Sequence, residues 1–365
     1  SNQITTQNRT KNSAQSNNAN QSQPPRLTQA LVSQNTAHGL ADLFANKDEQ
    51  ETINIKEFSG LKISSYSSSH SIQSQTTNPK LTKEIFSQIC LAQSKSDLKK
   101  CMRIVGVSSL QELCEIKLEG KTVLMVAAET GNRKLTYLLL ESVADPQRLA
   151  LMLSDDGLTA LMLAAAGRAK VVTALLSGVP NPQQLAERIN NSTTALIYAA
   201  LHENVEGIIA MLASVPNPQK LAEKIDDNGT TVLKVATFFS NVRVITALLN
   251  GVPNPQQLAE QNDKNGSTAL MLAASNGRVG VITKIFEYID DPEVLIFQVD
   301  RDGMNAFMRA LGKRKTEAAL VIFDKAKDKA SLMFKQNSPN QAAAIQMMSP
   351  DILEMFVKKF NETKE

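Results

Sequence analysis

A seven-residue segment recurs along the chain at a nearly constant interval, and this repeat limits the possible folds more than any other feature. The segment TALMLAA occurs twice in identical form, at 159–165 and 268–274. Four related segments begin at Thr122, Thr194, Thr231 and Asn305. Successive copies are therefore 37, 35, 37, 37 and 37 residues apart. A fixed period of this length predicts a solenoid, in which each repeat is one structural unit stacked on its neighbours.

A second, proline-containing element recurs between these segments. GVPNPQQLAE occupies 178–187 and 251–260, SVPNPQKLAE occupies 214–223, and SVADPQRL at 142–149 is a looser version. Proline cannot continue a helix from within, but it is well suited to the first turn of a new one. The element therefore predicts the end of one helix and the start of a further helix of one or two turns.

The residues of one repeat, 157–193, indicate how it folds. Gly157 follows two aspartates in a turn, and the hydroxyl of Thr159 can cap the helix that begins there. Apolar residues then recur at helical spacing at Leu161, Leu163, Ala164, Val171, Val172, Leu175 and Leu176. Neither helix can bury its apolar stripe alone, but stacked repeats can bury it continuously. We therefore predict an all-α protein, an α-solenoid of stacked helix pairs with a short extra helix per repeat.

The pattern DG-x-TALMLAA-x-x-G-x-x-x-VI-x-x-L, clearest at Asn265–Phe286 and Gly120–Leu140, resembles the ankyrin repeat. Ankyrin repeats are about 33 residues long, and the resemblance implies a helix pair with an outward β-turn finger. Here the extra length lies in the proline-containing element. We therefore expect a short third helix in place of a regular β-hairpin finger.

The chain divides into three predicted regions. Residues 1–37 contain no Asp or Glu and are rich in Asn, Gln and Ser, which predicts a disordered tail. Residues 38–80 are expected to form a poorly ordered or loosely docked extension and linker. The ankyrin-like solenoid is expected at 81–360, with degenerate capping repeats at 81–118 and 338–360. Clear repeats are expected to start near residues 120, 157, 192, 229, 266 and 303.

The resemblance also implies where a partner binds. Ankyrin arrays bind proteins on the concave face, through their turn tips and the ends of their first helices. The matching positions in this sequence are Glu129, Thr130, Leu201, His202, Phe238, Phe239, Ser275, Asn276, Met304 and Lys313. Phe238 and Phe239 stand where the motif has small or polar residues, and we expect one to be buried and the other exposed. The run Lys313–Lys315 is either a solvated helix end or a site for an acidic partner segment.

Composition and missing motifs exclude several other functions. The formal net charge is only +3, which does not favour a specific nucleic-acid binder. No apolar run reaches the ~18 residues of a membrane span, and no nucleotide-binding or hydrolase signature occurs. The three cysteines lack CxxC spacing and the three histidines are scattered. We therefore expect no metal, no cofactor, no small-molecule substrate and no enzyme activity. The cysteines are typical of a reducing, cytoplasmic compartment.

The resulting hypothesis is a protein–protein interaction scaffold that binds another protein on its concave surface. The alternative is a targeting module of an enzyme whose catalytic part is absent from this chain. The degenerate repeats, the Asn/Gln/Ser-rich leader and the tail FVKKFNETKE also resemble ankyrin-repeat effectors that intracellular bacterial pathogens deliver by type IV secretion. That resemblance implies a protein secreted into a host cell, with a host protein as its partner.

Overall fold

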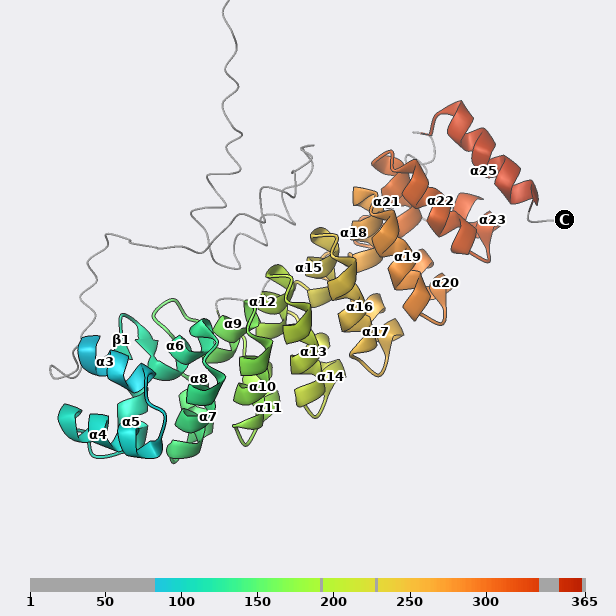
Figure 1. Cartoon of the computed structure of the whole chain (residues 1–365). Helices are drawn as coiled ribbons and strands as arrows, with labels where there is room; N and C mark the ends of the chain where they lie inside the picture. Colours follow the sequence, from blue (N-terminus) through green and yellow to red (C-terminus); the bar gives the residue numbers. More distant parts are fainter. Residues whose placement is uncertain (1–82, 191–192, 227–228, 335–347, 363–365) are drawn as a thin grey trace, which may run out of the picture.

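The computed structural model describes residues 83–190, 193–226, 229–334 and 348–362. Within these ranges the chain forms 22 helices and a single two-stranded sheet, which confirms the all-α prediction. The helices stack into an elongated array that runs in chain order from α3 to α25 (Figure 1). The predicted tail and extension at 1–80 lie outside the described residues, as does part of the predicted cap at 338–360.

The array consists of three rows of helices, because each repeat supplies one helix to each row. The A row contains α3 (Lys83–Cys90), α6 (Val123–Thr130), α9 (Ala160–Ala165), α12 (Ala195–Leu201), α15 (Val232–Phe238), α18 (Ala269–Asn276) and α21 (Ala306–Gly312). The B row contains α4 (Lys95–Val105), α7 (Arg133–Ser142), α10 (Ala169–Ser177), α13 (Val205–Ser214), α16 (Val242–Asn250), α19 (Val279–Tyr288) and α22 (Thr316–Lys325). The C row contains α5 (Leu110–Glu115), α8 (Pro146–Leu151), α11 (Pro182–Ala186), α14 (Pro218–Ala222), α17 (Pro255–Glu260), α20 (Pro292–Phe297) and α23 (Lys329–Phe334). Over most of the array, Figure 1 shows the A row along the upper edge and the C row along the lower edge.

The A-row helices begin where the repeated threonine predicted. The side-chain oxygen of the capping residue accepts a hydrogen bond from the backbone N–H three residues later, at 2.9–3.3 Å. The capping residues are Thr122, Thr159, Thr194, Thr231, Thr268 and Asn305. Each cap satisfies one N–H group that a helix start would otherwise leave without a partner.

The C row confirms the predicted short third helix. Its helices from α8 to α20 have proline in the first turn and an Asn or Asp cap immediately before it. A regular hairpin finger occurs once among the described residues, as β1 (Lys117–Leu118) paired with β2 (Lys121–Thr122). Two later turns retain only isolated bridges, Asn190 to Thr193 and Asn262 to Thr268.

The core runs along the whole array between the A and B rows. Leu161, Leu163 and Leu175 are buried, as predicted, and alanines such as Ala164 and Ala273 are fully buried on the A row. These small side chains let neighbouring A-row helices approach closely. Removing apolar surface from water at every repeat boundary stabilises the stack.

A row of glutamines joins successive C-row elements, and sequence reasoning missed it. In each case the side-chain Oε1 accepts a hydrogen bond from a backbone N–H of the next repeat, at 2.9–3.2 Å. The Nε2 donates to the carbonyl of that same residue, at 3.1–3.4 Å. We call this the glutamine ladder, and its members are Gln111, Gln147, Gln183, Gln219 and Gln256. Each glutamine amide therefore hydrogen-bonds both the backbone N–H and the backbone carbonyl of the residue that caps the next C-row helix.

Replacing Gln183 with glutamate is expected to lower the free energy of unfolding by about 1–2 kcal/mol. The Nε2 of Gln183 donates to the carbonyl of Asn217 and to the carboxylate of Glu187. A carboxylate at this position loses both donations and faces Glu187 as a like charge. Urea denaturation measures the change. The control is Gln184→Glu, because Gln184 is exposed and only its backbone N–H enters the described hydrogen bonds. Equal stabilities of the two variants would contradict a stabilising role for the ladder.

The thiol of Cys114 is expected to resist alkylation in the folded protein. Cys114 is fully buried, and desolvation raises the pKa of its thiol to about 12. At pH 8 a thiol with this pKa is about 0.01% thiolate, and the thiolate is the reactive form. Mass spectrometry after iodoacetamide treatment at pH 8 is expected to show Cys90, which is only half-buried, modified first. Equally fast modification of Cys114 would indicate that α5 opens readily.

Candidate protein-binding surface

The predicted partner-binding residues, except Met304, lie where the A-row helices end. Glu129 and Thr130 end α6, Leu201 ends α12, and Phe238 ends α15. The remaining residues of this set, which lie at or just after the ends of A-row helices, are His202, Phe239, Ser275, Asn276 and Lys313. Because A-row helices of neighbouring repeats pack side by side, these positions follow one another along the array. We call this surface the A-row face.

Aromatic and apolar side chains gather on the A-row face where α12 and α15 end. The rings of Tyr198 and His202 lie 4.6 Å apart, centroid to centroid. The rings of Phe238 and Phe239 lie 5.2 Å apart and meet edge to face. Leu201 is half-buried and packs against the core. We call these five residues the aromatic cluster.

The two phenylalanines differ from expectation. Both are half-buried, so the prediction of one buried and one exposed ring is wrong. Phe239 packs against the core, while the edge-to-face contact shields part of each ring. Each phenylalanine therefore shares its burial with the other and keeps apolar surface in contact with water.

Tyr198 belongs to the aromatic cluster, but sequence reasoning did not select it. The signal was present, because TALIYAA places tyrosine where both TALMLAA copies have leucine, at Leu163 and Leu272. His202 is the exposed end of the cluster. Desolvation by the surrounding protein lowers the pKa of its imidazole, which favours the neutral ring although the residue as a whole remains exposed.

The residues that follow the cluster adopt a backbone conformation that normally favours glycine. Glu203 and Ser240 have φ of +53° and +56°. At the equivalent place in other repeats the chain has Gly131 and Gly277, with φ of +80° and +70°. A side chain in this region costs about 1–2 kcal/mol. The sequence therefore keeps two side chains beside the aromatic cluster at a conformational cost, which is typical of functional surfaces.

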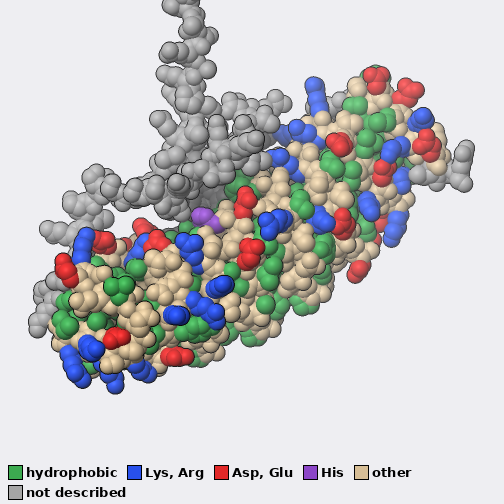
Figure 2. Space-filling view, viewed as in Figure 1, with side chains coloured by type: hydrophobic (Ala, Val, Ile, Leu, Met, Phe, Trp, Pro, Cys, Tyr) green, Lys and Arg blue, Asp and Glu red, His purple; other side chains and the backbone are tan. Residues whose placement is uncertain are grey.

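The C-terminal part of the A-row face is basic. Lys313, Arg314 and Lys315 follow α21 and are exposed, and Arg278 follows α18 and is half-buried. None of the four forms an ion pair with another residue in the described ranges. We call these four residues the basic cluster. In Figure 2, Lys and Arg side chains project from the upper edge of the C-terminal half.

Four of the predicted residues are buried or bonded within the array. Met304 is only 8% exposed, so its prediction as a partner contact is corrected: the side chain packs into the core beside the turn. Glu129 forms an ion pair with Lys121 at 2.7 Å. The hydroxyl of Thr130 donates a hydrogen bond to the carbonyl of Val126, also at 2.7 Å. The hydroxyl of Ser275 likewise donates to its own helix.

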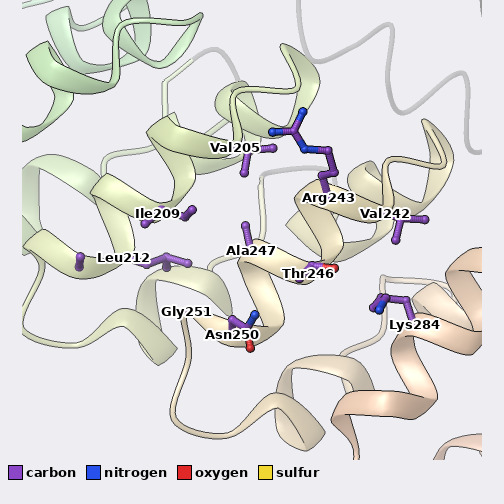
Figure 3. A pocket seen from close by; sticks show the side chains of 11 residues that line it. Val205, Ile209, Leu212, Val242, Arg243, Thr246, Ala247, Asn250, Gly251 and Lys284 are labelled. Carbon is purple, nitrogen blue, oxygen red and sulfur yellow. The ribbon is translucent and has the colours of Figure 1, made fainter.

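A shallow groove lies on the B row, away from the predicted residues. It has a volume of about 600 Å³ and is lined by side chains of α13, α16 and α19, including the exposed Ile209 (Figure 3). The cations at its edge already have partners, since Arg243 faces Glu206 and Lys284 bonds to Glu287. The groove is therefore mainly apolar.

Neither a metal-binding cluster nor a membrane-spanning helix occurs among the described residues. No group of three or more His, Cys, Asp or Glu side chains there is arranged to hold a metal ion. Nor is any helix in that part of the chain both long and apolar enough to cross a membrane.

Comparisons with known proteins identify the architecture. Residues 91–185 match a family model described as ankyrin repeats in three copies. The structure is similar to the ankyrin repeat domain of Bcl-3, which is described as a unique member of the IkappaB protein family. That similarity has a TM-score of 0.54 and 19% identity, and it covers 66% of this chain and 98% of the Bcl-3 domain. It is also similar to an ankyrin repeat protein from Leishmania major, with a TM-score of 0.47 and 17% identity, over 75% of this chain and 99% of the other.

A search among curated proteins finds no match to this sequence. The described solenoid has a fold similar to that of an ankyrin repeat domain, and residues 91–185 also match the ankyrin-repeat family model.

Proposed function

We propose that this protein is a protein-interaction scaffold that binds a partner protein on its A-row face. The observation that carries the proposal is the aromatic cluster, in which five apolar or aromatic side chains from two adjacent repeats keep exposed surface. Residues of this type dominate the binding energy of protein interfaces. The costly backbone conformations of Glu203 and Ser240 beside the cluster support the same surface.

We also propose that the partner is a host protein and that the protein acts inside a host cell. The resemblance of the composition to type IV secreted effectors supports a host protein as the partner and the host cell as the place of action. The alternative, a targeting module for an enzyme, keeps the same binding surface and differs in what is attached to it. A translocation reporter fused to the chain tests the effector role, since only a secreted effector delivers the reporter into host cells.

Replacing Phe238 and Phe239 with alanine is expected to abolish capture of the partner, because the change removes the largest apolar surface of the cluster. The measurement is affinity capture from eukaryotic cell lysate, with quantitative mass spectrometry of the proteins retained by each variant. Circular dichroism first establishes that the double variant folds like the wild type.

The matched control removes two exposed apolar side chains elsewhere. Ile104 on α4 and Ile209 on α13 are 56% and 53% exposed, so Ile104→Ala/Ile209→Ala is expected to retain the partner. A partner lost by the control and held by the phenylalanine variant would place the site on the B row and contradict the proposal.

A further inference from the structure

We propose that the A-row face selects one kind of protein segment, in which bulky apolar side chains and acidic side chains stand a few residues apart. The apolar side chains pack on the aromatic cluster, and the acidic ones pair with the basic cluster. This inference rests on the proposed function, because it names the chemistry of the partner that binds the same face.

The basic cluster is arranged to attract carboxylates. Arg278 and Lys315 occupy the positions that cap α19 and α22, and neither makes a side-chain cap bond. At the same position α7, α13 and α16 have Asn132, Asn204 and Asn241, which do cap. The sequence has therefore replaced a capping amide with a cation, although a helix N-terminus disfavours positive charge.

The cations of this cluster have donors that the protein itself does not use. The Nε of Arg278 is buried and has no hydrogen-bond partner among the described residues. Its counterpart Arg168 donates from Nε to the carbonyl of Glu129, at 3.1 Å. Glu317, in the first turn of α22, is an exposed acid close in sequence to Lys315, and it makes no ion pair with the cluster. A partner carboxylate would pair with the exposed cationic groups of Lys313, Arg314 and Lys315 and meet a positive potential.

The two clusters lie within reach of one short segment. α15, which carries Phe238, packs against α18, and α18 packs against α21. Neighbouring helices stand about 10 Å apart, so the step from α15 to the end of α21 is about 20 Å. An extended chain covers this distance in about six residues. It covers the shorter distance of about 10 Å, from α15 to Arg278 at the end of α18, in about three residues. We therefore expect the acidic residues three to six positions from the apolar ones, in either chain direction.

A protein segment fits this face better than a single-stranded nucleic acid. Stacking of bases needs flat, open ring faces. Phe238 and Phe239 are both half-buried and stand at 82° to each other, so they offer edges and partial faces. The low net charge of +3 also gives little general attraction for a polyanion.

The test is selection of random 16-residue peptides displayed on phage against the immobilised full chain. We expect the enriched peptides to combine Leu, Phe, Met or Trp with Asp or Glu at the predicted spacing. Synthetic copies are then titrated against Lys313→Gln/Arg314→Gln/Lys315→Gln. The affinity is expected to fall at least tenfold at 50 mM salt, and this difference is expected to shrink at 500 mM salt.

The matched control is Lys134→Gln/Lys170→Gln, which removes two exposed lysines from α7 and α10 on the B row. It is expected to change the affinity less than twofold. Phe238→Ala/Phe239→Ala is expected to lose the same peptides as the basic-cluster variant. Agreement of these three results supports the inference.

Three other outcomes would overturn it. If the enriched peptides lack acidic residues and bind the basic-cluster variant as tightly as the wild type, the charge preference is wrong. The binding face is then still supported if the phenylalanine variant no longer binds these peptides. Failure to enrich any peptide would also refute the inference, while the lysate capture would still decide the proposed function. Tighter binding of a thymidine 20-mer than of any selected peptide would replace the protein segment with a nucleic acid.

Discussion

Replacing Asp263 with asparagine is expected to lower the free energy of unfolding by about 1.5–3 kcal/mol. The carboxylate of Asp263 pairs with the ammonium group of Lys234, whose side chain lies buried in the first turn of α15 in the preceding repeat. Without the carboxylate, the buried ammonium group of Lys234 loses an ionised hydrogen-bond partner. Asparagine keeps an acceptor for the N–H groups of Asn265 and Ser267, which Asp263 also bonds, so the variant isolates the lost charge.

The opposite result is expected when both charges of the pair are removed. Other repeats have methionine at this position, at Met125, Met162 and Met271. The double variant Lys234→Met/Asp263→Asn is therefore expected to be as stable as the wild type or more stable by about 1–4 kcal/mol. Urea denaturation of the two single variants and the double variant measures the coupling. A change below about 0.5 kcal/mol in Asp263→Asn would show that this ion pair contributes little to the stability of the array.

Replacing Phe356 with alanine is expected to detach α25 (Pro350–Glu362) from the array. Phe356 is the one buried residue of this helix, and its ring meets those of Phe307 and Phe323 at 5.4 and 5.1 Å. Loss of a buried phenylalanine costs about 3–5 kcal/mol. The ion pair of Lys359 with Asp324 is solvent-exposed and contributes little to holding the helix.

Hydrogen exchange with mass spectrometry tests the detachment of α25. The expected result is fast exchange throughout α25 and in α22, with unchanged protection from α6 to α16. The matched control is Val357→Ala, because Val357 is 39% exposed and adjacent in sequence. Unchanged protection of α25 in Phe356→Ala would show that the remaining contacts are sufficient to dock it.

The parts of the fold that depend on local pattern were predictable from the sequence. The threonine before each apolar segment predicted the caps of the A-row helices, and the paired prolines predicted the short helices of the C row. Both signals act within a few residues of the element they specify, so a single repeat carries them. The six-fold recurrence then indicated that the units stack.

The parts that depend on the register between repeats were not predictable. The glutamine ladder requires Gln183 to meet the backbone of Asn217 in the next repeat, and sequence spacing alone does not place those atoms together. Lys234 looked like a surface residue because the partner that neutralises it, Asp263, belongs to the following repeat. Met304 looked like a turn tip because its burial depends on how the turn folds back on the core.

The sequence predicted which helix ends lie on the candidate surface, but not how their side chains pack. The ends of the A-row helices did come together, because the repeat fixes their place. The half-burial of both phenylalanines, the ring of Tyr198 and the missing caps at Arg278 and Lys315 depend on side-chain packing across repeats. A motif cannot specify such packing.

The glutamine ladder also bears on how the array opens. Its rungs join residues 34 or 35 positions apart, so each one closes a loop of only about one repeat length. An array held together at this range has low contact order, and it loses repeats one after another from its ends. The repeats that carry the aromatic cluster lie in the middle, with stacked units on both sides. Fraying therefore reaches them last, and the protein can lose terminal repeats during brief thermal excursions while these central repeats stay folded.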